Sequence, residues 1–165
     1  FCLSRGLGDV YKRQAFNSTA PTSTNITVGT NSGTNTDGNK YIMYAFTNIQ
    51  GYSKAGIYSG NGDADGAFVY TGFRPAWGLF KRTDSSDNWH IKDNKRDPVN
   101  PADARLRVNS SEAEAQDQME IDFLSNGFKI RVSPNALNAD GATYFYMAFA
   151  ESPFVSSAGV PTTAK

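Results

Sequence analysis

The feature that most constrains the fold is a series of short segments rich in β-branched and aromatic residues, separated by clusters of Gly, Asn, Asp and Pro. The segments recur about every 8 to 12 residues, a spacing that is typical of all-β sandwiches and barrels. The sequence therefore predicts an all-β fold, a single and mostly antiparallel β-sandwich of the jelly-roll or lectin-like kind. The predicted strands are Lys40–Asn48, Ala55–Ser59, Ala67–Phe73, Ala76–Arg82, Asn88–Asp93, Arg105–Val108, Gln118–Leu124, Gly127–Val132 and Thr143–Glu151.

Two connections between these strands have recognisable local chemistry. Ser125-Asn126-Gly127 predicts a tight hairpin, because Asn and Gly tolerate the positive φ of primed turns. Ser110–Gln116, a Glu/Ala stretch that follows a capping Ser, is the one segment for which we expect a helix, of at most about two turns.

The first 14 residues are interpreted as foreign to the protein. Ser4–Gln14 resembles the in-frame translation of a transposon-based sequencing adaptor, and such segments are excluded from fold reasoning. Residues 15–38 are predicted to be a Ser/Thr/Asn-rich linker with one short strand at Ile26 and Val28, and residues 39–165 to be the sandwich domain. We also expect a larger protein to continue upstream.

Charge and composition exclude several functional classes. Residues 15–165 carry 13 Lys+Arg against 15 Asp+Glu and no cysteine. Nucleic-acid binding needs a basic stripe that this balance does not provide, and thiol redox chemistry is excluded. No apolar run approaches the roughly 18 to 20 residues of a membrane helix, so we expect no membrane insertion. With a single histidine, a structural zinc site lacks ligands, and no cofactor is expected.

Two segments of the chain, Asp37–Phe46 and Asp140–Phe149, repeat each other. We expect them to form similar strands in equivalent positions of one sandwich. Alternation of side chains gives each strand two apolar faces. The Tyr-rich face is covered either by a loop or by another subunit, since Tyr is enriched at interfaces. The candidate interface residues on that face are Tyr41, Met43, Tyr144 and Tyr146.

One pair of carboxylates invites a catalytic interpretation. Glu120 and Asp122 project from the same face of a strand and resemble part of the Glu-x-Asp motif of laminarinase-like glycosidases. Retaining hydrolysis needs a second carboxyl group as general acid, but the motif would place it at Leu124 or Ser125. We therefore expect no catalytic residue and no enzymatic activity.

The segment Asn61–Gly66 has the spacing of the first half of a calcium loop, in which alternate oxygens surround the ion. Position twelve of such a loop is a bidentate Glu, and here it is Gly72. Asn61, Asp63 and Asp65 are thus calcium candidates, and a turn between two strands is the alternative interpretation.

The single histidine, His90, lies in a predicted strand. Alternation places Trp89 and Ile91 toward the core and His90 outward with Asn88 and Lys92. No Ser or Cys motif accompanies it. Two interpretations remain: a solvated edge histidine, or a sugar-binding surface formed by Trp89, His90 and Asn88. Trp77 and Leu79 are expected in the core.

Several segments together carry a resemblance that covers Asn39–Lys165. They are Gly38–Phe46, Gly51–Gly62, Phe68–Trp77, Lys81–Thr83, Asp122–Lys129, Tyr144–Glu151, Pro153–Phe154 and Gly159–Pro161. These segments are similar to a domain of unknown function that is common in marine phage structural proteins. The resemblance implies a position at the C-terminal end of tail-fibre-like or other virion proteins, and it assigns no catalytic residue.

The functional expectation is a non-enzymatic structural domain of the phage virion or tail, assembled in the host cytoplasm. It would associate with other virion or tail proteins or with further copies of itself, or attach to the host surface. The alternative is a lectin-like module that binds a host-surface glycan through the loops Gly60–Gly66 and Thr83–Asn88. An inactive glycoside-hydrolase-like sandwich is the third reading.

Overall fold

The computed structural model describes residues 15–132 and 136–153, without the side chains of residues 117–120. The adaptor-like segment therefore lies outside the described residues. The chain divides into two compact units, Phe1–Phe46 and Thr47–Lys165, so the division falls later than the predicted domain start at Asn39. No helix in the described part of the chain is long and apolar enough to cross a membrane.

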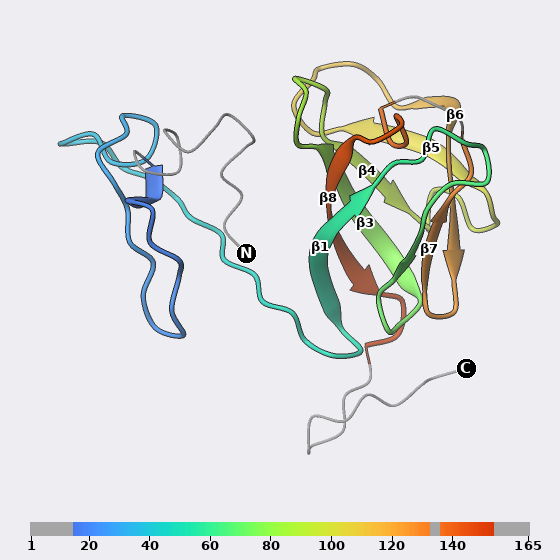
Figure 1. Ribbon diagram of the computed structural model, residues 1–165, viewed down its shortest axis with the longest axis horizontal. Coiled ribbons are helices and arrows are strands. Elements are labelled where there is room, and N and C mark those ends of the chain that lie inside the picture. Colours follow the sequence, from blue (N-terminus) through green and yellow to red (C-terminus); the bar gives the residue numbers. More distant parts are fainter. Residues whose placement is uncertain (1–14, 133–135, 154–165) are drawn as a thin grey trace. The chain divides into compact units, whose positions relative to one another are not determined.

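The second unit is an antiparallel sheet of eight strands (Figure 1). The sheet order is β1-β8-β3-β4-β5-β6-β7-β2, so β3 to β7 follow one another as a meander and β8 inserts between β1 and β3. The predicted all-β antiparallel sandwich is confirmed. The strands are β1 (Ser53–Ser59), β2 (Phe68–Tyr70), β3 (Pro75–Arg82), β4 (His90–Asp93), β5 (Ala102–Arg107), β6 (Ala115–Leu124), β7 (Gly127–Ile130) and β8 (Thr143–Ala150).

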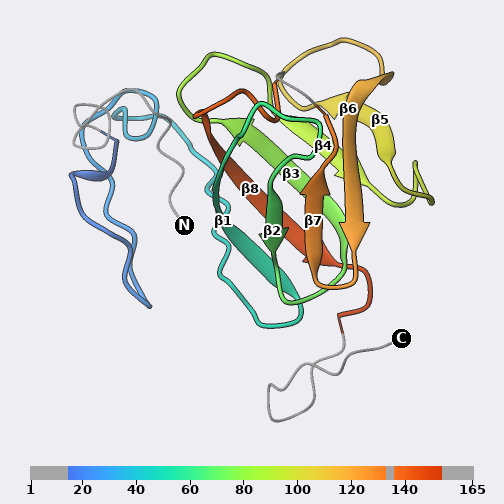
Figure 2. The same ribbon diagram turned by 45° about the vertical axis from the view of Figure 1, so that its right-hand side comes forward.

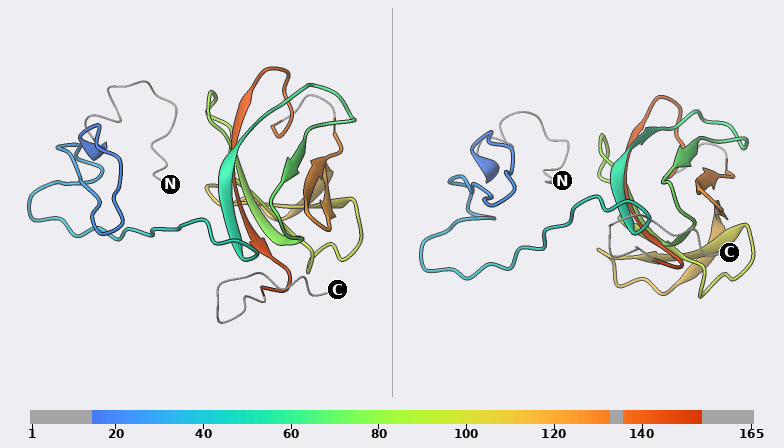
Figure 3. Two further views of the ribbon diagram at one scale, coloured as in Figure 1. Left: turned by 60° about the horizontal axis from the view of Figure 1, so that its bottom comes forward. Right: turned by 90° about the horizontal axis from the view of Figure 1, so that it is seen from below.

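The sheet folds over on itself into two layers that share β5. One layer is β1-β8-β3-β4-β5 and the other is β5-β6-β7-β2. The register between β5 and β6 shifts between Ala102 and Ala104, and such irregularities bend a strand and increase its twist. Viewed from the end, the strands surround a common interior (Figure 3).

Aromatic side chains fill this interior. Phe128 on β7 is fully buried, and its ring makes edge contacts with Phe80 at 5.2 Å, Tyr146 at 5.2 Å and Tyr58 at 6.0 Å. Tyr58 in turn stacks on Tyr144 with ring centroids 4.9 Å apart. Phe128 belongs to one layer and its partners to the other, so this cluster holds the two layers together.

The predicted hairpin at Ser125-Asn126-Gly127 is confirmed, since Leu124 and Gly127 pair across it. The reason for Gly127 is close approach of the backbone. A Cβ atom at this position would lie 2.2 Å from the carbonyl oxygen of Val69 on β2, whereas Gly127 is not among the residues with positive φ. Only a residue without a side chain lets β2 pair with β7 here.

Three local predictions are wrong. Lys40–Asn48 forms no strand, so it is not equivalent to β8 despite the repeat. Ile26 and Val28 also lie outside any strand. Ser110–Gln116 is not helical: the chain is irregular until β6 begins at Ala115. Each of these predictions rested on local composition alone. Whether an extended segment becomes part of a sheet depends on its pairing with a neighbouring strand.

We predict that Phe128→Ala lowers the free energy of unfolding by about 3–5 kcal/mol, because it removes the ring that joins the two layers and leaves a cavity. Phe68→Ala on the neighbouring strand is the matched control. Phe68 is 47% exposed, so its truncation should cost less than about 1 kcal/mol. Urea denaturation followed by circular dichroism measures both values, and equal losses would contradict the central position of Phe128.

Candidate functional site

His90 points into the interior, which overturns its predicted outward orientation. It pairs across the sheet with the core residue Phe80, and only 1% of its surface is exposed. Lys92, on the same face, is also fully buried, and its Nζ donates a hydrogen bond to the carbonyl oxygen of Asp103 at 2.6 Å. Trp89 and Ile91 are the partly exposed residues of this segment. The predicted alternation of side chains along this strand is correct, but the face predicted to be exposed is the buried one.

The surroundings of His90 keep its imidazole neutral. Burial, together with the nearby charges of Arg105, Arg107 and Lys92, lowers the His90 pKa to about 4. Neither ring nitrogen has a hydrogen-bond partner among the described side chains. A neutral imidazole without access to solvent is not placed to exchange protons with a substrate. The exposed sugar-binding surface of Trp89, His90 and Asn88 is therefore not formed, because His90 is buried and Asn88 and Trp89 are only partly exposed.

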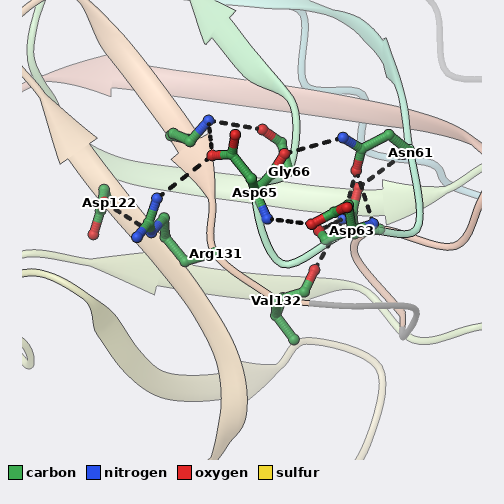
Figure 4. A network of polar contacts seen from close by, with 9 residues as sticks. Asn61, Asp63, Asp65, Gly66, Asp122, Arg131 and Val132 are labelled. Atoms are coloured by element: carbon green, nitrogen blue, oxygen red, sulfur yellow. Dashed lines mark hydrogen bonds and ion pairs between the residues drawn. The ribbon is translucent and has the colours of Figure 1, made fainter.

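The loop Asn61–Gly66 is organised by hydrogen bonds from within the protein (Figure 4). Asp63 N–H donates to Asn61 Oδ1 at 3.1 Å, and Asp65 N–H donates to Asp63 Oδ1 at 2.8 Å. The fully buried Asn138 donates through Nδ2 to Asn61 Oδ1 at 3.0 Å and to the Asp63 carbonyl at 2.7 Å. Its own Oδ1 accepts from Asn61 N–H at 3.1 Å.

Cationic side chains face the acidic end of this loop. Lys129 Nζ lies 2.8 Å from Asp65 Oδ1, and Arg131 lies between Asp65 at 3.8 Å and Asp122 at 3.4 Å (Figure 4). The hydrogen bond and charge of Lys129 lower the pKa of Asp65. In the part of the chain that is described, no group of three or more His, Cys, Asp or Glu side chains is arranged to hold a metal. The contacts within the protein account for the conformation of Asn61, Asp63 and Asp65 as a turn.

The four residues of the predicted interface lie in two different environments. Tyr144 and Tyr146 are buried in the core cluster, so they form no surface for another subunit. Tyr41 and Met43 are exposed and lie in the first unit. Tyr41 is anchored locally: its hydroxyl donates to the Ser32 carbonyl at 2.7 Å and accepts from Thr36 N–H at 3.0 Å. The two pairs of residues therefore do not share a face.

The opposite face of β8 carries the apolar surface. Met147 pairs with Ala55 on β1 and with Leu79 on β3, Leu79 pairs with Ile91 on β4, and Ile91 pairs with Leu106 on β5. An apolar row thus crosses five strands on the side away from the core. Trp77 and Phe149 lie beside it, with ring centroids 5.6 Å apart. We call these residues the outer apolar face: Ala55, Trp77, Leu79, Ile91, Leu106, Met147 and Phe149.

All members of the outer apolar face retain accessible surface. Trp77 and Leu79 were expected in the core, and this prediction is wrong. Both faces of β3 and β8 are apolar, so a period of two does not tell which face turns inward. Tyr144, Tyr146 and Phe80 take the interior instead.

Two features of the site were not found from the sequence. Asn138 sits in a stretch that reads as an ordinary turn, and its partners Asn61 and Asp63 are 77 and 75 residues away. The outer apolar face depends on register between five strands. Neither leaves a local signal. Of the carboxylate pair, Asp122 contacts Arg131, and the side chain of Glu120 lies outside the described residues.

Comparison with known proteins gives one match. The sequence model of a family described as a domain of unknown function, DUF7483, matches residues 3–153. The matched range includes the whole of the adaptor-like segment Ser4–Gln14. The interpretation of that segment as an adaptor stays a prediction. None of the curated proteins and none of the solved structures matches the chain.

We predict that the protein loses stability on acidification through His90. Its folded pKa of about 4 lies below the unfolded value of 6.5, so below pH 6.5 the unfolded state binds the proton more tightly. This contribution is fully present above pH 6.5 and is lost between pH 6.5 and about 4, by about 3 kcal/mol in total.

His90→Gln should remove this part of the pH dependence, leaving a free energy of unfolding that changes by about 1 kcal/mol less than wild type between pH 7.5 and 5.5. His90 is the one histidine of the chain, so its NMR titration reports the imidazole directly. An imidazole that titrates near its ordinary pKa would refute the buried, neutral state.

Asn138→Ala should destabilise the protein by about 1–3 kcal/mol, because it removes the part-buried hydrogen bonds that hold Asn61 and Asp63 of the loop. Asn126→Ala, at an exposed turn position, is the control and should change the free energy of unfolding by less than about 0.5 kcal/mol. Thermal and urea denaturation measure both. Equal stabilities of the two variants would show that the loop does not depend on Asn138.

Proposed function

The chain belongs to the DUF7483 family of domains of unknown function, and from this premise we propose that it is a non-enzymatic structural domain of a phage virion or tail. In this proposal it works by binding other virion proteins or further copies of itself through the outer apolar face. The resemblance of Asn39–Lys165 to domains of marine phage structural proteins supports the biological setting. The physical support comes from the surface of the β1-β8-β3-β4-β5 layer.

The observation that carries the proposal is the apolar row across five strands. An antiparallel layer that covers one core normally alternates apolar residues inside with polar residues outside. Here the outward positions Leu79, Met147 and Ile91 are apolar as well, and Trp77 lies next to them. Contiguous apolar surface with aromatic and Met side chains is typical of protein–protein interfaces.

Association would remove this surface from water without a change of fold. The row lies on the middle strands of the layer, where β8 and β3 are each paired on both sides. Backbone groups there are already hydrogen bonded, so a partner gains from side-chain contact. About 25 cal/mol per Å² of apolar surface is the driving force available to such a contact.

Binding of a host-surface glycan is the alternative function. The polar surface proposed for it is not formed, since His90 and Lys92 are buried. The loops Gly60–Gly66 and Thr83–Asn88 remain the place for a glycan. A glycan array is the direct comparison, and reproducible hits that vanish on loop substitution would favour attachment over assembly.

We predict that Met147→Lys lowers the weight-average mass of the protein in sedimentation experiments and reduces binding of the dye ANS, because a charge in the middle of the outer apolar face must be desolvated on association. Val99→Lys is the control. Val99 is 74% exposed in the connection between β4 and β5 and belongs to neither strand, so neither readout should change. Unaltered mass and dye binding in a folded Met147→Lys protein would rule out assembly through this face.

A further inference from the structure

The outer edge of β1 is only half occupied. β1 is the last strand of its layer and pairs with β8 on one side. On the other side, Ser53 exchanges two backbone hydrogen bonds of 2.9 Å with Ile49. Ala55 N–H donates to the side-chain oxygen of Asn48 at 2.7 Å. In an antiparallel strand alternate residues point their N–H and C=O groups to the same side, so Ile57 and Ser59 also present theirs away from β8.

Asn48 explains why the preceding chain does not continue along this edge. Ile49 and Ser53 begin a hairpin, and its next pair would join the backbones of Thr47 and Ala55. The Asn48 side chain occupies that place, because its Oδ1 accepts from Ala55 N–H and its Nδ2 donates to the Ala55 carbonyl at 3.4 Å. The hairpin ends there. Ile57 and Ser59 are left as an unpaired edge, and Ile57 is 64% exposed.

The segment Ile42–Ala45 resembles a strand but has no neighbouring strand to pair with among the described residues. It has the β-branched and aromatic residues of a strand, yet within the described chain it lies in no strand and makes no backbone hydrogen bond. Ile42 is 82% exposed and Tyr44 is 79% exposed. Tyr41, just before it, is held by Ser32 and Thr36 of the first unit. An apolar extended run with free backbone groups is a strand that lacks a neighbour.

We propose that two copies of the chain exchange these segments: Ile42–Ala45 of each copy adds as a strand to the Ile57–Ser59 edge of β1 in the other. The inference rests on the proposed function, since it specifies one contact of the assembly. Addition of a strand to an exposed edge gives affinity through the backbone and specificity through alternate side chains. In a two-fold dimer, the β1 edge of each copy pairs with the Ile42–Ala45 segment of the other copy.

The surrounding side chains fit an apolar guest. Phe68 and Tyr70 of β2, the other terminal strand of the sheet, are exposed, and β1 and β2 can be followed in Figure 2. Lys54 reaches from β1 to β2, where its Nζ donates to the Tyr70 carbonyl at 2.9 Å and lies 5.3 Å from the Tyr70 ring centroid. This contact and the Asn48 cap close the first half of the edge, so the guest strand is confined to Ile57–Ser59.

The donated segment carries large exposed side chains. Ile42 is 82% exposed and Tyr44 is 79% exposed, and an aromatic side chain buries on the order of 150–250 Å² when it is enclosed. Reciprocal exchange removes such side chains from water in both copies. Each edge also gains the hydrogen bonds of Ile57 and Ser59.

Two proline variants of the full chain test the exchange. Ile57→Pro removes the outward N–H of the receiving edge without touching the β1–β8 hydrogen bonds, and Ala45→Pro does the same to the donated segment. The variants are made in a Met147→Lys background, so that association through the outer apolar face does not mask the result. Each proline variant should then sediment as a monomer where the Met147→Lys parent is a dimer. Mixed together, the two should form a heterodimer, because one supplies an intact segment and the other an intact edge. Ile57→Ala and Ala45→Ser keep the N–H groups and should still dimerise.

Hydrogen exchange at the amides of Ile57 and Ser59 gives a second readout that does not depend on the variants. In wild type these amides should be protected and should lose protection on dilution to monomer. Protection that persists in the monomer would show that the chain pairs with its own edge. A wild-type protein that is monomeric at every concentration, or a dimer that both proline variants retain, would also overturn the exchange.

The outer apolar face is tested separately. Met147→Lys leaves the edge of β1 intact, so it should retain the dimer and lose only larger assemblies. If Met147→Lys changes nothing while the proline variants abolish the dimer, assembly through the outer face fails and strand exchange stands. The reverse pattern would leave the proposed function standing and remove the exchange.

Discussion

The packing of Phe128 against Phe80, Tyr58 and Tyr146 is the interaction on which the rest of the domain depends. In a sheet that folds over on itself, the apolar surface enclosed between the two layers is the main force that holds them together. Tyr58 extends this cluster to the far loop, because its hydroxyl donates to the Leu137 carbonyl at 2.9 Å. That contact lies next to Asn138, which organises the Asn61–Gly66 loop. Core and loop are therefore one connected structure.

The interior is polar at the position of β4. His90 and Lys92 replace apolar residues there, and the cost of burying them is limited by keeping the imidazole neutral and by the hydrogen bond from Lys92 to Asp103. These groups face inward, so they contribute little to the surface. The surface chemistry of the layer is left to the outer apolar face and to the free edge of β1. Both favour contacts with protein over contacts with a small polar ligand.

Much of the fold was predictable from the sequence, and less of the site. Eight of the predicted segments coincide with strands, because β-branched and aromatic runs between Gly, Asn and Pro clusters have few other stable conformations. The candidate site was predicted less well than the fold. The orientations of Tyr144 and Trp77 were wrong because β8 and β3 each have two apolar faces. The orientation of His90 was wrong for another reason: in β4 the face that carries His90 and Lys92 is the buried one. Tyr41 and Met43 are exposed, whereas Tyr144 and Tyr146 belong to the core.

The sequence by itself determined the class of fold, the strands and the β6–β7 hairpin, since these follow from local preferences of a few adjacent residues. Only the tertiary structure decided which face of β3, β4 and β8 is buried, where Asn138 finds its partners, and that Lys40–Asn48 stays outside the sheet. Alternation fixes that neighbouring side chains point in opposite directions. It does not fix which direction is inward, because that choice depends on what the opposite layer and the neighbouring strands bring into contact.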